Sequence, residues 1–394
     1  MKDTKDNIQF RILYFLGICL IIAGHCDGLS IPLFQKWFPN YSFHIGLFVF
    51  CSGYFFINNK NKRILKFVKK ITKKFLIPLY TWNLIYGIII TILHQYGIKF
   101  GVALDWKSLL IMPLYDGHQF VFNLSSWFII PLYFLQLINI FVIKILKKKD
   151  CYYYINFIVS TIIGFIGLDF SIKGYNTGFF LFLVRLAYFA PFFALGMLYK
   201  NNLEKYDKLN NLKYFAILFF ISLIVILHYG GEKAYTPSLG NDFDNFYRPF
   251  IAGFLGIAFW LRVSKILIPI LQSNQYVMKI SKNTFSIMMH HLAGFFLLNT
   301  IFNFINIYIR NLPSFDYVEY INNIWYRYLP RGIENFNLVY GIFGILFSLY
   351  VNRLTQTIKK WLTEKNSLIY NKISGSTIID LSIKGLYQKS YIDY

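Results

Sequence analysis

Ten segments of the chain are each apolar over about 20 residues, and no other feature limits the fold as strongly. An α-helix rises about 1.5 Å per residue, so about 20 apolar residues cross a hydrocarbon core about 30 Å thick. These segments are continuously apolar and much longer than the roughly ten alternating residues of a barrel strand. We therefore expect an all-α polytopic membrane protein with about ten transmembrane helices, near residues 9–28, 42–58, 75–96, 126–146, 152–170, 178–199, 212–229, 249–271, 281–304 and 335–358.

The composition agrees with helices in a bilayer. Hydrophobic residues make up 56% of the chain and charged residues only 15%, whereas soluble domains are about 25% charged. This excludes a soluble enzyme and a disordered chain. The four cysteines show no C-x-x-C spacing, which argues against a disulfide framework or a zinc site. No small-residue cleavage site follows the first apolar segment, so we expect an uncleaved first span.

The basic residues predict the orientation of the chain. A net charge of +22 would indicate nucleic acid in a soluble protein. Here, 30 of the 40 Lys and Arg residues fall in one alternate set of loops and nine in the other, and one lies within a span. Such asymmetry marks the cytoplasmic side. We therefore expect both termini in the cytoplasm, an even number of spans and no nucleic-acid partner.

Three long connections lie on the opposite side, at about 97–125, 230–248 and 305–334. They are candidates to shape a site on the outer face. Residues 1–360 then form the transmembrane domain, and the polar stretch 361–394 is expected to be a cytoplasmic tail.

Ionisable side chains inside the expected spans are the first functional candidates, because a bilayer makes them costly. His25 lies near the end of the first span, and His44 opens the second. Arg185 lies about a third of the way along the sixth span. His290 and His291 lie mid-span and point about 100° apart on a helix, so at most one is expected to face a given cavity. The predicted topology puts the other three in the outer half of the membrane.

These residues alone leave the function open. A histidine can accept and return a proton near neutral pH, but a single intramembrane histidine is also common as an interhelical hydrogen bond. Arg185 stays charged and needs a carboxylate, phosphate, carbonyl or water partner. An enzyme, a proton-coupled transporter and a handler of lipid-linked sugars all fit.

Four stretches occur in a characteristic order and spacing: RILYFLGICLIIAGH (11–25), SFHIGLFVFCSGYFF (42–56), KKFLIPLYTWNLIYG (73–87) with FNLSSWFIIPLYFLQLI (122–138), and ISKNTFSIMMHHLAGFF (280–296). Together they resemble the acyltransferase-3 family of bacterial membrane O-acyltransferases, including its fucose-O-acetylase-like members, over most of residues 10–360. One position departs from the family, which often carries Arg or Lys where this chain has Tyr14. Arg11 is the nearest basic residue.

The resemblance implies transfer of an acyl group, most often acetyl, from cytoplasmic acyl-CoA to a hydroxyl of an envelope saccharide or lipid-linked glycan. The enzyme would be a multi-pass protein of the bacterial cytoplasmic membrane without a bound metal, and homo-oligomerisation is left open. His25 would be the general base or an acyl relay. His44 and one of His290 and His291 would orient substrate or stabilise the oxyanion, and Arg185 would stabilise negative charge.

The resemblance also implies residues around the donor and the acceptor. Ser52 and Gly53 would allow close helix approach near the acyl path. The basic loop could attract the phosphates of acetyl-CoA, although anionic lipid headgroups are the simpler partner. The residues expected to bind the donor are Arg11, Lys69, Lys70, Lys73 and Lys74, and those expected to contact the substrate are Ser52, Trp127, His118 and Asp169.

Two other functions remain as alternatives. A transporter or flippase of lipid-linked saccharides would use buried His and Arg, but it usually shows internal repeats and broken helices, which the sequence does not clearly show. A membrane glycosyltransferase would be expected to place a catalytic carboxylate in the first external loop, and residues 29–41 contain no Asp or Glu.

Overall fold

The described part of the chain folds almost entirely into helices. The computed structural model describes residues 7–26, 36–56, 64–145, 151–230 and 234–374. Within these ranges there is no strand, and only an isolated bridge joins Thr236 to Asn241. The predicted all-α class is therefore confirmed. Residues 1–6 and 375–394 and parts of four expected loops lie outside the described residues, among them the basic residues Lys60, Lys62, Arg63, Lys147, Lys148 and Lys149.

Nine helices of the described chain are long and apolar enough to cross a membrane, which confirms a polytopic membrane protein. Several expose an apolar stripe, as a lipid-facing surface requires. On one helix Ile158, Ile162 and Ile166 are about half exposed at intervals of four residues. The nine are α1 (Ile8–His25), α4 (Ile64–Ile71) continuing through η1 (Thr72–Leu76) into α5 (Ile77–Gln95), η2 (Val121–Phe128) with α8 (Ile129–Ile145), α9 (Tyr152–Ile172), α10 (Gly178–Leu198), α11 (Asn211–Tyr229), α12 (Arg248–Ile266), α15 (Thr284–Tyr308) and α17 (Asn337–Ser374).

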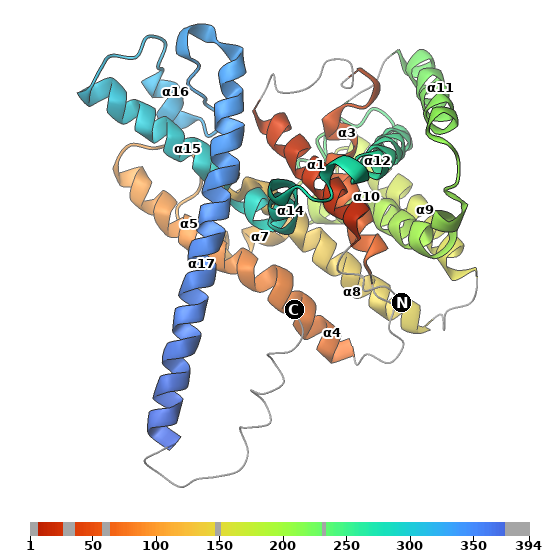
Figure 1. Cartoon of the computed structure of the whole chain (residues 1–394), viewed down its shortest axis with the longest axis horizontal. Helices are drawn as coiled ribbons and strands as arrows, with labels where there is room; N and C mark the ends of the chain where they lie inside the picture. Colours follow the sequence, from red (N-terminus) through yellow and green to blue (C-terminus); the bar gives the residue numbers. More distant parts are fainter. Residues whose placement is uncertain (1–6, 27–35, 57–63, 146–150, 231–233, 375–394) are drawn as a thin grey trace. The chain divides into compact units, whose positions relative to one another are not determined.

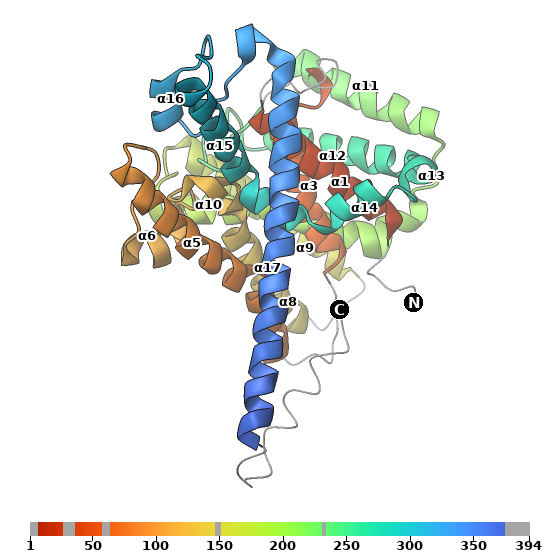
Figure 2. The same cartoon turned by 60° about the vertical axis from the view of Figure 1, so that its left-hand side comes forward.

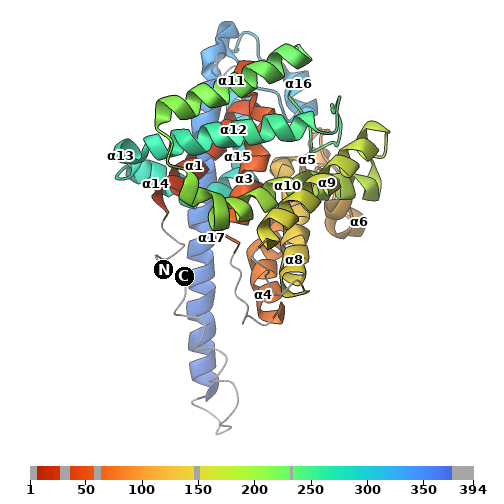
Figure 3. The same cartoon turned by 90° about the vertical axis from the view of Figure 1, so that its right-hand side faces the viewer.

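The segment predicted to span at 42–58 forms a shorter helix, α3 (Asn40–Tyr54), of 15 residues. At about 1.5 Å per residue it is about 22 Å long, less than the bilayer core. Nearly all its side chains are buried, because α1, α10 and α12 pack around it (Figure 1). Its apolar side chains therefore pack against neighbouring helices rather than facing lipid. Figures 2 and 3 both show α1, α3 and α12 side by side.

Glycines let α3 and α10 approach until their backbones touch. A Cβ atom on Gly53 would overlap the carbonyl oxygen of Phe193, and one on Gly196 would overlap the carbonyl oxygen of Phe50. Small residues at such contacts are typical of helix packing in membranes. The close helix approach expected at Gly53 is therefore present. This contact fixes the position of α3 against α10.

Short helices fold in several of the connections between the long helices. Asp105 caps the first of them by accepting a hydrogen bond from the backbone N–H of Ser108, and this bond lowers the pKa of Asp105. The connections contain α6 (Trp106–Leu110), α7 (Met112–Tyr115), η3 (Tyr199–Leu203), η4 (Glu204–Tyr206), α13 (Ile268–Leu271), α14 (Gln275–Lys282), α16 (Tyr317–Asn322), η5 (Pro330–Gly332) and η6 (Glu334–Phe336).

The chain divides after Ser348 into two compact units. In the second unit the described residues, 349–374, are the remainder of α17. The predicted boundary between membrane domain and tail, at 360/361, falls within this helix and stays a prediction.

Candidate functional site

A cavity of about 570 Å³ brings predicted site residues together. Its lining includes residues of α1 and α3, and each of the three long connections contributes at least one side chain. The polar and aromatic side chains that line it are His25, Tyr41, His44, Asp116, His118, Ser125, Trp127, Thr236, Ser238 and Trp325.

His25 ends α1 and is the first of two hydrogen-bonded histidines. Nδ1–H of His291 donates to the carbonyl oxygen of Ile287 at 2.8 Å. In a neutral ring Nε2 of His291 is then an acceptor, and Nδ1 of His25 lies 2.7 Å from it. Nδ1 of His25 therefore carries the proton and Nε2 keeps its lone pair. The two rings are nearly parallel, with centroids 5.0 Å apart.

Residues of the last long connection hold the end of α1. Nη1 of Arg327 donates to the carbonyl oxygen of His25 at 2.6 Å, and its Nε donates to Oδ1 of Asn337 at 3.1 Å. A cation at a helix C-terminus satisfies an otherwise unpaired carbonyl and complements the helix dipole. The ring of Trp325 lies edge-on to His25, 5.1 Å between centroids. These contacts fix the position of the His25 side chain.

His44 lines the same cavity from α3. Its Nδ1–H donates to the carbonyl oxygen of Asn40 at 2.5 Å, so its Nε2 also carries a lone pair in the neutral ring. The ring of Tyr41 lies perpendicular to it at 5.1 Å. His25 and His44, which were predicted from different spans, therefore share one cavity.

His290 has a different environment from its neighbour His291. Its Nδ1 lies 2.7 Å from the hydroxyl oxygen of Tyr86, and its ring packs edge-on against Trp82 at 4.2 Å. Both partners belong to α5. His290 thus joins two helices, whereas His291 contacts the cavity histidine, as the 100° separation on a helix allows.

Arg185 lies behind the cavity wall and is almost completely buried. It donates to the carbonyl oxygens of Tyr115 at 3.3 Å, of Asp116 at 2.9 Å and of Ser238 at 3.0 Å. Its guanidinium also lies 5.0 Å from the ring centroid of Trp127. Arg185 therefore ties two connections together, and it is not among the side chains that line the cavity.

The first long connection adds a hydrogen-bonded pair and an unpaired hydroxyl to the lining. Nδ1 of His118 lies 3.2 Å from Oδ1 of Asp116, and the side chain of Ser125 is buried without a hydrogen-bond partner among the described residues. The sequence predicted His118 and Trp127 here but not Asp116, Ser125 or Trp325. Ser125 lies in the FNLSSWF stretch, where a polar residue within an apolar run was the available signal.

Other predicted residues lie away from the cavity lining. Asp169 pairs with Lys173 at 2.6 Å on the exposed end of α9. Ser52 lies on α3 beside the contact with α10. Arg11 lies in the first turn of α1, about 21 Å from His25 along the axis, and Tyr14 packs against Phe48. The expected donor-binding lysines are exposed on α4 and η1: Lys69, Lys70, Lys73 and Lys74.

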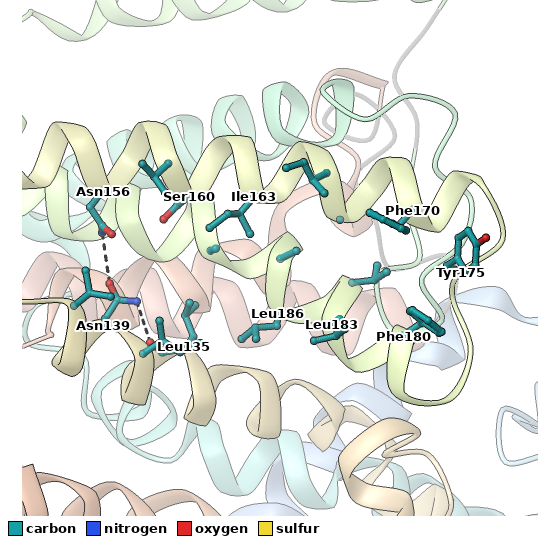
Figure 4. Close-up of a pocket in the computed structure, with 18 residues that line it drawn as sticks. Leu135, Asn139, Asn156, Ser160, Ile163, Phe170, Tyr175, Phe180, Leu183 and Leu186 are labelled. Carbon is teal, nitrogen blue, oxygen red and sulfur yellow. Dashed lines mark hydrogen bonds between the residues drawn. The ribbon is translucent and has the colours of Figure 1, made fainter.

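A second hollow of about 460 Å³ lies between α8, α9 and α10 and has a mostly apolar lining (Figure 4). The polar side chains in its lining bond to neighbouring residues: Asn156 donates to Asn139, and Asn139 donates to the carbonyl oxygen of Leu135. None of the predicted site residues lines it. As for metals, no group of three or more His, Cys, Asp or Glu that could hold an ion occurs in the described ranges.

Comparison with known proteins identifies a family. No curated protein and no solved structure matches the chain. The family model described as an acyltransferase domain, that of the acyltransferase-3 family, matches residues 9–326, a range that includes every residue lining the cavity. This confirms the family that the four sequence stretches resemble. The chain therefore belongs to the acyltransferase-3 family and is a multi-pass membrane acyltransferase.

Proposed function

We propose that the protein transfers an acyl group, most simply acetyl, from cytoplasmic acyl-CoA to a hydroxyl group of a cell-envelope or exported saccharide. The observation that carries this proposal is the hydrogen-bond chain from the Ile287 carbonyl through His291 to His25, which leaves a lone pair on Nε2 of a histidine that lines a cavity. A hydroxyl is a weak nucleophile, so its transfer chemistry needs such a base.

In the proposed step, Nε2 of His25 takes the proton of the acceptor hydroxyl, and the hydroxyl oxygen attacks the carbonyl carbon of the thioester. The C–S bond then breaks, and the imidazolium returns the proton to the leaving thiolate. His291 accepts the hydrogen bond from Nδ1–H of His25 and so stabilises the imidazolium that forms. In a relay variant Nε2 attacks the thioester and the C–S bond breaks, so that the CoA thiolate leaves. The saccharide hydroxyl then attacks the acyl-imidazole, and its proton passes to the thiolate. Both variants use the same lone pair, and trapping of an acylated His25 distinguishes them.

The negative charge that develops on the thioester oxygen needs a hydrogen-bond donor. The Ser125 hydroxyl is suited to this, because it is buried at the cavity and has no partner among the described side chains and backbone groups. Neutral His44 presents an acceptor instead, which suits it to orient a hydroxyl. In this proposal Arg185 does not contact the oxyanion. It positions Asp116 and Ser238 of the cavity lining through hydrogen bonds to their carbonyl oxygens.

The distribution of basic residues supports a cytoplasmic donor. It predicts that the N-terminal end of α1, with Arg11, faces the cytoplasm, and that His25 lies toward the outer face. The long pantetheine arm of acyl-CoA would then carry the thioester along the membrane normal to His25. The exposed lysines of α4 and η1 would attract the CoA phosphates at the cytoplasmic surface, where anionic lipids compete.

Mass spectrometry of the surface glycan tests the proposal. Deletion of the gene should remove one acetyl group per modified sugar, and the wild-type gene should restore it. His25→Ala should fail to restore it at normal protein levels, whereas His228→Ala, at the end of α11 and outside the cavity, should restore it. Full acetylation with His25→Ala would contradict the proposed role, and unchanged glycan in the deletion strain would contradict the saccharide acceptor.

A further inference from the structure

The cavity has an unusual charge balance for a site that binds an envelope glycan. Of the described side chains that line it, Asp116 is the only one with a permanent charge. Two arginines contact lining residues without lining the cavity themselves. Arg185 donates to backbone carbonyls of two connections, and Arg327 donates to the His25 carbonyl and to Asn337. A carboxylate or phosphate in this space would meet a negative charge and no Lys or Arg among the described lining residues.

The hydrogen-bonding character of the lining points the same way. Nδ1–H of His118 is directed to Asp116, so its Nε2 is an acceptor in the neutral ring, like Nε2 of His25 and of His44. The Asp116 carboxylate is an acceptor as well. A ligand that satisfies these groups must therefore bring hydrogens, as sugar hydroxyls do. Carboxylate and phosphate oxygens would place lone pairs against lone pairs.

Two hydroxyl groups of the lining add no free donors for an anion. The Tyr41 hydroxyl donates to the carbonyl oxygen of Gly24 at 2.9 Å, and the Thr236 hydroxyl donates to Asp242 at 2.5 Å. The flat side chains of Trp127 and Trp325 offer apolar surface to the C–H face of a ring. Apart from the Ser125 hydroxyl, which the proposed reaction assigns to the thioester oxygen, the lining groups with assigned hydrogen bonds thus present acceptors, beside aromatic surface and one negative charge.

We infer that the saccharide unit that enters this cavity is uncharged, and that Asp116 selects it. Asp116, oriented by His118 at 3.2 Å, accepts hydrogen bonds from ring hydroxyls and repels sugars that carry a carboxylate or phosphate. His118 is a positioning residue in this scheme. The inference rests on the proposed acyl transfer and adds the class of acceptor, a neutral sugar rather than a uronic acid or phosphorylated sugar.

The test uses the full-length protein in nanodiscs of phosphatidylcholine, with radiolabelled acetyl-CoA and two soluble acceptors. These are a methyl hexoside and the matching methyl hexuronoside, which differ only by a carboxylate at C6. We expect kcat/KM to be at least about tenfold higher for the neutral glycoside, since two like charges placed next to each other repel. Asp116→Asn should reduce this ratio about tenfold. The matched control Asp105→Asn, at an exposed helix cap outside the cavity lining, should leave the ratio unchanged.

Equal kcat/KM for the hexuronoside and the hexoside with the wild type would overturn the inference. Equal ratios for Asp116→Asn and Asp105→Asn would overturn it too. Binding is measured separately from transfer, by saturation-transfer NMR of both glycosides on the His25→Ala protein. Preference for the neutral glycoside there, with no transfer by the wild type, would support the selective site and contradict the proposed function. Equal binding of both glycosides would contradict the inference whatever the transfer activity.

Discussion

Nδ1 of His25 lies 2.7 Å from Nε2 of His291, although 266 residues separate them in the chain. The contact joins α1 to α15, and the Ile287 carbonyl determines which nitrogen of His291 carries the proton. The hydrogen bond to the Ile287 carbonyl leaves Nε2 of His291 as an acceptor, so Nδ1 of His25 must be the donor. The backbone of α15 therefore determines which nitrogen of His25, on α1, carries the proton. This relationship accounts for the chemistry that we expect from His25.

Substitution of His291 should lower the rate of transfer without weakening acceptor binding. We expect His291→Leu to reduce kcat about 10–100-fold with little change in KM, because His25 loses its orienting acceptor. His291→Gln should retain more of kcat, since its amide oxygen can still accept a hydrogen bond. Initial rates with labelled acetyl-CoA measure both. Equal loss in the two variants would argue against the hydrogen bond as the cause.

The adjacent His290 provides the contrasting case. Its partner is the Tyr86 hydroxyl, at 2.7 Å, so His290→Leu should leave a buried hydroxyl unpaired and cost about 1–3 kcal/mol of stability. The kcat per folded molecule should stay near the wild-type value. Thermal unfolding in detergent and active-site-normalised rates check the two parts. A loss of kcat as large as that of His291→Leu would contradict the division of roles between these neighbours.

Ser125→Ala tests the proposed oxyanion donor. We expect kcat to fall about 100-fold or more, as removal of one such donor does in other acyl-transfer enzymes. Stability should not fall, because the Ser125 hydroxyl has no partner to lose within the described structure. Ser126→Ala, a buried neighbour that does not line the cavity, is the control and should keep its kcat. Unchanged kcat in Ser125→Ala would exclude this hydroxyl as the donor.

The sequence predicted the helical class and two cavity histidines because both depend on local signals. His25 and His44 are ionisable groups in long apolar runs, and lipid makes such groups conspicuous. The choice between His290 and His291 depends on how α15 is rotated against α1, which no local pattern contains. The sequence also could not predict that α3 is too short to span, because lipid and buried protein surroundings both favour the same run of apolar residues.

Asp116, Ser125 and Trp325 could not be predicted as site residues for a different reason. They lie in connections, where polar and aromatic residues are ordinary, and only tertiary folding brings them to one cavity. Arg185 shows the opposite case. It was conspicuous as a charge within a span, and the structure satisfies that charge with carbonyl oxygens of two connections.

Gly53→Ala should destabilise the protein, because the added methyl group would overlap the Phe193 carbonyl at the contact of α3 with α10. Overpacking at a well-packed contact costs about 1–3 kcal/mol, and a backbone neighbour cannot rotate away. Ser52→Ala, one residue earlier on the same helix, should have a much smaller effect. Thermal unfolding in detergent measures both variants. Equal stability of the two would show that α3 and α10 can separate without cost.

Arg185→Lys distinguishes a wall-building role from direct stabilisation of negative charge. An ammonium keeps the charge but cannot reproduce a planar fork that donates to Asp116 and Ser238 from separate nitrogens. We therefore expect lower thermal stability and a several-fold higher acceptor KM, because both carbonyls belong to residues that line the cavity, with a smaller change in kcat. Kinetics with labelled acetyl-CoA and a neutral glycoside give the two constants separately. A fall in kcat of about 100-fold with unchanged KM and stability would instead support direct action of Arg185 on the oxyanion.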